Sequence, residues 1–157
     1  MNIGELINAL KDACRGLESE FGDEFLGLML FGSWARGEAG EGSDVDVLVL
    51  FNSLRGLETR ARAYEVLKRF INRDITLIDM RRSELSGKLT ALAMNIAYDG
   101  VIICDRQGDL TRFKDAVIKF IGSECLVRYR TRDGKYGWVR ADGKPMLKAV
   151  RGDVRSA

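Results

Sequence analysis

The sequence predicts an α+β fold, in which helices pack on a mixed β-sheet and a small β-hairpin follows at the C-terminal end. Short apolar runs alternate with longer amphipathic segments along the first 122 residues. The first two apolar runs are joined by about ten residues, too few for a crossover helix, so these strands should pair antiparallel. After residue 122, alternating apolar and polar residues flank an Asp-Gly pair, a pattern typical of a hairpin.

Each element follows from the spacing of its apolar residues. Apolar residues at three- and four-residue steps predict helices over residues 3–20, 55–71, 84–98 and 110–121. Asp109 is the expected N-cap of the last helix. Short β-branched and apolar runs predict strands over residues 25–31, 44–51, 74–80 and 101–104. Residues 33–43 are small, polar and glycine-rich, which indicates a turn with room for one helical turn.

The chain divides by composition into one domain, residues 1–122, and a basic β-hairpin appendage with its tail, residues 123–157. This appendage carries nine Lys or Arg against four Asp or Glu, whereas the whole chain has a net charge of +2. Aromatic residues alternate with arginines in the predicted hairpin, and such a pattern can bind RNA by stacking and charge. A hairpin docked on the domain, with a tail that keeps the protein in solution, explains the same pattern.

Composition excludes several kinds of site. The chain has no histidine, which excludes a His-based triad, a His general base and a His metal ligand. No apolar stretch approaches about 20 residues, so we expect no membrane span. The first residues lack a signal-peptide pattern, so we expect a cytoplasmic protein.

Cys14, Cys104 and Cys125 are far apart and form no Cys-x-x-Cys pair. We therefore expect neither a disulfide framework nor a zinc site, with Cys14 and Cys104 as core residues.

The most informative motif runs from Gly32 to Glu38 and resumes at Ser43-Asp44-Val45-Asp46. Gly32 and Ser33 supply a tight turn in which backbone amides can approach a phosphate closely. Asp44 and Asp46 share one face of a strand, because alternate side chains in a strand point the same way. Magnesium prefers carboxylate and phosphate oxygens. The motif therefore predicts a magnesium–nucleotide site.

Nucleotidyl transfer typically uses two divalent ions about 3.5–4 Å apart, which calls for a third carboxylate on a neighbouring strand. Asp74 and Asp79 are the candidates. In a regular strand Asp74 and Thr76 share a face, whereas Asp79 faces the other way. We therefore favour Asp74 and keep Asp79 as the alternative.

The two halves of this motif together resemble the signature of the minimal nucleotidyltransferase (MNT) domain of the DNA polymerase β-like nucleotidyltransferase superfamily. The resemblance covers roughly residues 5–105. It implies that Gly32 and Ser33 bind a triphosphate and that Asp44 and Asp46 bind magnesium. Ser43 belongs to the implied nucleotide-binding residues, and Arg36 either touches the phosphate or braces the loop. In the family an Asp within an apolar strand is often followed by another three positions later. If Asp79 is aligned with that second Asp, Thr76 falls at the position of the catalytic residue.

This resemblance implies an enzyme that moves a nucleoside monophosphate from a nucleoside triphosphate, ATP above all, to a hydroxyl group. Two Mg²⁺ ions are the expected cofactors, with Mn²⁺ as an alternative. The implied acceptors are a HEPN-type partner protein, as in antitoxins that AMP-modify a HEPN toxin, an RNA end or a small molecule. The alternative hypothesis is a catalytically degenerate module of the same fold that binds a nucleotide, RNA or a toxin.

Overall fold

A computed structural model describes residues 1–144. Its centre is a four-stranded sheet in the order β3-β2-β1-β4. The strands are β1 (Phe25–Phe31), β2 (Val45–Phe51), β3 (Ile75–Arg81) and β4 (Val101–Asp105). β1 pairs antiparallel with both β2 and β4, and β2 pairs parallel with β3. The sheet is therefore mixed, and the predicted antiparallel pairing of the first two strands is confirmed.

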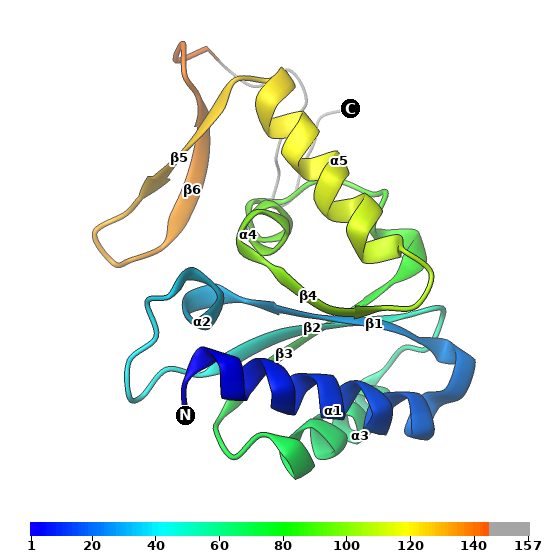
Figure 1. The fold of residues 1–157 in the computed structure, drawn as a ribbon. Helices are drawn as coiled ribbons and strands as arrows, with labels where there is room; N and C mark the ends of the chain where they lie inside the picture. The colour runs from blue at the N-terminus through cyan, green and yellow to red at the C-terminus, as the bar shows by residue number, and fades with distance from the viewer. Residues whose placement is uncertain (145–157) are drawn as a thin grey trace.

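Helices cover both faces of the sheet (Figure 1). One face carries α1 (Ile3–Phe21) and α3 (Leu57–Phe70), and the other carries α4 (Ala91–Asp99) and α5 (Asp109–Ser123). The short helix α2 (Gly32–Arg36) directly follows β1, and two 3₁₀ turns are η1 (Gly22–Glu24) and η2 (Arg82–Glu84). Within residues 1–144, no helix is long and apolar enough to cross a membrane.

The alternation of side chains along β2 decides where the polar residues lie. Val45, Val47 and Val49 are fully buried against α1 and α3. Leu48 and Leu50 point to the opposite face and join the core beneath α4 and α5. Asp46 shares this second face because it is two residues before Leu48. The strand therefore presents the carboxylate of Asp46 on the α4 side, at the end of the sheet near α2.

Two expected helix starts are wrong. The helix expected over residues 84–98 begins only at Ala91, where the Thr90 hydroxyl accepts a hydrogen bond from the backbone N–H of Ala93 at 2.9 Å. Asp109 is not the N-cap of α5, because Gly108 takes that position with φ 79°. The orphan amides at this helix start, those of residues 110 and 111, instead donate to the carboxylate of Asp105.

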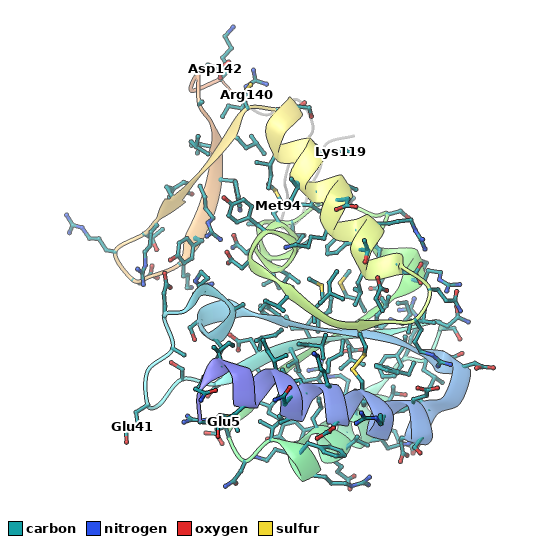
Figure 2. The ribbon with its side chains drawn as sticks, in the orientation of Figure 1. Glu5, Glu41, Met94, Lys119, Arg140 and Asp142 are labelled. Carbon is teal, nitrogen blue, oxygen red and sulfur yellow. A yellow bond between two sulfur atoms is a disulfide. The ribbon has the colours of Figure 1, made fainter. Side chains whose placement is uncertain are left out.

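The expected absence of a disulfide is also wrong, whereas Cys14 is buried in the core and Cys104 packs against it, as expected. Cys14 and Cys104 form a disulfide with a Cα–Cα distance of 6.7 Å, and Figure 2 shows this yellow bond between α1 and the sheet. The pairing arises because β4, at the sheet edge, packs beside α1. Ninety residues separate the two cysteines, so no local spacing could indicate the bond. Cys125 is a free, exposed thiol.

The predicted C-terminal hairpin is present as β5 (Leu126–Arg130) and β6 (Tyr136–Arg140). It forms its own two-stranded sheet and docks on α4 (Figure 1). Trp138 is buried in this contact, and its ring N–H donates to Oδ1 of Asn95 at 2.9 Å. The docked-hairpin alternative therefore accounts for one of the aromatic residues that suggested RNA binding.

Candidate nucleotide and metal site

The turn between β1 and α2, which carries the first half of the motif, lies directly against Asp46 of the second half. Gly32 has φ +73°, a conformation that favours glycine. A Cβ atom at Gly32 would lie 2.0 Å from Oδ2 of Asp46, because Phe31 and Asp46 are register partners on β1 and β2. The absence of a side chain thus lets the Gly32 backbone lie close against the carboxylate of Asp46. The two halves of the sequence motif form one site.

Asp44, Asp46 and Thr76 lie together at the start of β2 and β3. Asp46 and Thr76 are register partners, and the Thr76 hydroxyl donates a hydrogen bond to Oδ2 of Asp44 at 3.1 Å. Burial raises the pKa of Asp46; a hydrogen bond with Thr76 opposes this shift, and the like charge of Asp44 adds to it. Two carboxylates that repel one another in a partly buried site favour a cation between them.

The donor set fits one magnesium ion rather than a fully protein-built cluster. Among residues 1–144, no group of three or more His, Cys, Asp or Glu side chains is placed to hold a metal. Magnesium commonly binds one or two carboxylates and completes its coordination with water and phosphate oxygens. Asp44 and Asp46 meet that requirement beside a turn whose amides suit phosphate.

Among residues 1–144, Asp74 forms no three-carboxylate metal group with this pair, although its backbone lies beside the start of β2. Asp74 is exposed and precedes β3, where its carbonyl oxygen accepts the N–H of Val45 at 2.8 Å. It lines a polar recess of about 260 Å³ together with Ser43 and Arg73. Thr76, one pleat further along the strand, holds the position next to the two carboxylates.

The alternative candidate, Asp79, lies on the opposite face of the sheet. Its side chain is only 7% exposed and pairs with Arg60 of α3 at 3.0 Å and with Arg81 at 2.6 Å. Its register partner is Val49, which faces α1 and α3. Asp79 is three residues from Thr76, and this odd spacing places the two side chains on different faces.

Trp34 and Ser43 hold the loop between α2 and β2. The Trp34 ring N–H donates to the carbonyl of Ser43 at 3.5 Å, and the ring is buried. The Ser43 hydroxyl accepts the N–H of Gly40 at 2.8 Å and so fixes the turn before Asp44. The guanidinium of Arg73 stacks 5.1 Å from the Trp34 ring. In this structure both residues act on the shape of the loop.

Arg36 connects the Gly-Ser helix to α4 and to the hairpin. It pairs with Glu38 at 2.9 Å and with Asp99 at 3.2 Å, and the Asp99 side chain is only 5% exposed. Arg128 of β5 reaches the same Asp99 oxygen at 2.8 Å. Both guanidinium groups lie over the Tyr136 ring, at 4.6 and 4.2 Å from its centre. Asp99 was missed by sequence reasoning because a lone acid at a helix end carries no signal.

A Gly-Ser turn packed against the Asp46 carboxylate, in a mixed sheet covered by helices, agrees with a nucleotidyltransferase fold. The family model "Polymerase beta, Nucleotidyltransferase" matches residues 19–109. A Methanocaldococcus jannaschii protein named "Putative protein adenylyltransferase MJ1305" is 35% identical over 107 residues, which cover 64% of this chain and 73% of that protein. A second protein of that organism with the same designation, MJ0141, is 32% identical over 66 residues, covering 42% of this chain and 67% of its own. The chain belongs to the polymerase β nucleotidyltransferase family.

Solved structures agree with this fold. The crystal structure of a toxin–antitoxin with AMP-PNP superposes with a TM-score of 0.53 at 21% identity, covering 72% of this chain and 87% of that one. A tri-AMPylated Shewanella oneidensis HEPN toxin in complex with an MNT antitoxin gives a TM-score of 0.50 at 21% identity, covering 76% and 87% of the two chains. At such identities the likeness concerns the fold alone.

Proposed function

We propose that this protein transfers AMP from ATP to a hydroxyl group on a partner protein, in a reaction that depends on Mg²⁺. The contact of Gly32 with the Asp46 carboxylate carries the proposal, because it joins a phosphate-binding turn to a metal-binding pair. The two Methanocaldococcus relatives, named as protein adenylyltransferases, support a protein acceptor. A cytoplasmic location, where ATP is present, belongs to the same proposal.

Each residue of the site has a separate role in the proposed reaction. The backbone amides of Gly32 and Ser33 bind the phosphates that leave as pyrophosphate. Asp44 and Asp46 would hold Mg²⁺, and the bound ion would supply charge neutralisation at the phosphates and a lower pKa of the attacking hydroxyl. Arg36, braced by Asp99, adds positive charge beside the turn. Catalysis is then mainly positioning and charge neutralisation.

A HEPN-type protein is the partner that we infer. The solved structures that share this fold include a HEPN toxin in complex with an MNT antitoxin, in which the toxin is AMPylated. RNA contact through the hairpin belongs to the alternative function. Of the hairpin aromatic residues, Tyr129 is 47% exposed and free to stack, whereas Trp138 is buried.

The second candidate function is binding of the nucleotide without transfer. One observation favours it: a neutral threonine, Thr76, stands beside Asp44 and Asp46 where a third carboxylate would complete a two-metal site. A site with two carboxylates can hold one ion and a triphosphate without activating an acceptor.

The decisive experiment measures transfer of AMP to an acceptor and, by a parallel titration, Mg²⁺-dependent binding of ATP. The full chain is incubated with Mg²⁺, α-labelled ATP and a HEPN-type protein, and label on protein and released pyrophosphate are both counted. We expect Asp44→Asn and Asp46→Asn to lower transfer by about 100-fold or more. Asp12→Asn, an exposed aspartate on α1, is the matched control and should transfer at the wild-type rate.

Mg²⁺-dependent ATP binding without label on any acceptor would select the binding module. Transfer that persists in both site variants would contradict the proposed function and its metal site together. Multiple turnovers by the wild-type chain would exclude the binding module.

A further inference from the structure

A cavity of about 530 Å³ opens between β3 and α4, on the same sheet face as Asp46. It does not belong to the site described above, because it includes none of the residues assigned to phosphate or metal. Its floor is formed by β3 and its wall by α4 and the segment before it. The principal lining side chains are apolar: Ile78, Met80, Leu85, Leu92, Ala93 and Ile96.

The cavity continues the line of the site along β3. Thr76, Ile78 and Met80 alternate on one face of this strand, and Thr76 is the register partner of Asp46. Two residues of a strand span about 7 Å. The cavity therefore begins about one pleat from the carboxylates. It lies toward the β3 edge of the sheet, away from β1.

The chemistry of transfer determines which substrate meets this side. A bond forms between the acceptor oxygen and the α-phosphorus, while the bond from that phosphorus to the bridging oxygen breaks. Pyrophosphate leaves with the electron pair, and the hydroxyl proton passes to water. Because entering and leaving oxygens lie roughly in line, they stand on opposite sides of the α-phosphate. In the proposed function Gly32 and Ser33 bind the leaving pyrophosphate at the end of β1, so the acceptor would enter from the β3 edge of the sheet.

We propose that the cavity binds an apolar side chain of the acceptor protein, two residues away from the hydroxyl that receives AMP. This inference rests on the proposed function and adds the substrate class. In an extended segment, side chains two residues apart point the same way and are about 7 Å apart, which matches the step from Thr76 to Ile78. The apolar lining favours an aliphatic or aromatic side chain as the anchor.

The test uses pairs of synthetic peptides whose only hydroxyl belongs to Ser, Thr or Tyr, with leucine or alanine two residues to either side. In the wild-type chain, the leucine peptide should be modified with a kcat/KM roughly tenfold higher, because it buries an extra aliphatic side chain. Ala93→Phe fills the cavity and should abolish this preference. Ala93→Leu is a milder filling and should reduce it.

Ala61→Phe is the matched control. Ala61 lines a separate recess beside α3 and β3, with Arg60 and Leu77, on the opposite side of the sheet. This variant should keep both the leucine preference and the wild-type rate. The melting temperature shows whether each variant remains folded. The affinity for a non-hydrolysable ATP analogue in the presence of Mg²⁺ shows whether it still binds the nucleotide.

Three results would overturn the inference. One is an equal rate for leucine and alanine peptides in the wild-type chain. Another is an Ala93→Phe variant that binds the ATP analogue much more weakly, because the cavity would then hold the nucleotide. The third is transfer to a protein acceptor that Ala93→Phe leaves unchanged. If no acceptor at all receives AMP, the proposed function fails, and the role of the cavity fails with it.

Discussion

The hydroxyl of Thr76 donates a hydrogen bond to Oδ2 of Asp44 at 3.1 Å, so a neutral side chain occupies the third place beside the two carboxylates. Thr76 also lies opposite Asp46 in the β2–β3 register. The protein therefore offers two negative charges where a two-metal site generally offers three. Under the proposed function, the affinity for Mg²⁺ would depend on these few oxygens.

Thr76→Asp should create the missing ligand. We expect the affinity for Mg²⁺ to rise by about tenfold or more, because a third carboxylate then faces the ion. Without Mg²⁺, three neighbouring carboxylates should lower the melting temperature. Calorimetric titration with Mg²⁺ and a thermal melt with and without the ion measure both effects. An unchanged affinity would show that residue 76 does not face the metal.

Asp74→Asn separates the two candidates for the third position. Asp74 lies in the recess with Ser43 and Arg73, so its amide variant should leave Mg²⁺ affinity and transfer within about twofold of wild type. The same calorimetric and transfer assays apply. A loss of transfer as large as that in Asp46→Asn would instead identify Asp74 as the third carboxylate.

Gly32→Ala should disrupt the site more than its backbone strain alone explains. Gly32 and Gly37 have nearly the same φ, +73° and +75°, at the two ends of α2. A Cβ atom at Gly37 meets nothing within 4 Å, whereas one at Gly32 strikes the Asp46 carboxylate. Gly37→Ala should therefore cost only the left-handed strain, about 1–2 kcal/mol.

Gly32→Ala should lose more stability than Gly37→Ala and should also bind the Mg²⁺–ATP analogue much more weakly. Urea unfolding and nucleotide titration on the pair of variants give the comparison. If both variants bind the nucleotide equally well, the contact between Gly32 and Asp46 has no part in binding.

The raised pKa of Asp46 makes stability depend on pH in a defined direction. Burial disfavours the charged carboxylate, so the folded protein binds this proton more tightly than the unfolded chain does. The contribution to stability is present below the ordinary aspartate pKa of 3.8 and is lost as pH rises through the higher folded value. At neutral pH, Asp46→Asn should therefore raise the melting temperature of the metal-free protein.

Mg²⁺ should raise the melting temperature of the wild-type chain and leave that of Asp46→Asn nearly unchanged, because the ion requires the ionised carboxylate. Melting curves between pH 4 and 8, with and without Mg²⁺, measure both effects. A lower melting temperature for the metal-free Asp46→Asn protein at neutral pH would contradict this assignment.

The fold was largely predictable because its strands are short apolar runs closed by glycine or charged residues. The strand predicted over residues 25–31 is β1 itself. The start of α4 was not predictable from periodicity, because apolar residues in the preceding segment line the cavity and mimic a helical pattern. Only the N-cap residue Thr90 distinguishes the helix α4 from the non-helical segment before it.

The site was predictable where it depends on neighbours in one strand pair. Gly32 and Asp46 flank the β1–β2 connection, so pairing of these strands brings them together. Contacts made between distant elements left no trace in the sequence. The Cys14–Cys104 disulfide and the shared Asp99–Arg128 pair join segments whose adjacency only the fold decides.

The disulfide should contribute measurable stability. Linking residues 90 apart restricts the unfolded chain, and bonds of this kind typically contribute about 2–5 kcal/mol. Dithiothreitol should lower the urea midpoint of the wild-type chain. The Cys14→Ser/Cys104→Ser double variant should be equally weak with and without it, and Cys125→Ser should behave as wild type. Three titratable thiols in the unreduced, unfolded wild-type chain would show that the bond is absent.

Asp99→Asn tests whether the positions of the hairpin and of the Gly32–Ser33 turn depend on one buried carboxylate. This change leaves Arg36 and Arg128, both less than 20% exposed, without the charge that they share. We expect a loss of about 2–4 kcal/mol in unfolding free energy and weaker binding of the ATP analogue, because Arg36 is no longer held beside the turn. Asp142→Asn is the control, since Arg140 and Asp142 lie together at the other end of the hairpin (Figure 2). That control should melt and bind nucleotide as wild type does. Equal nucleotide affinity in Asp99→Asn and wild type would confine Asp99 to a structural role.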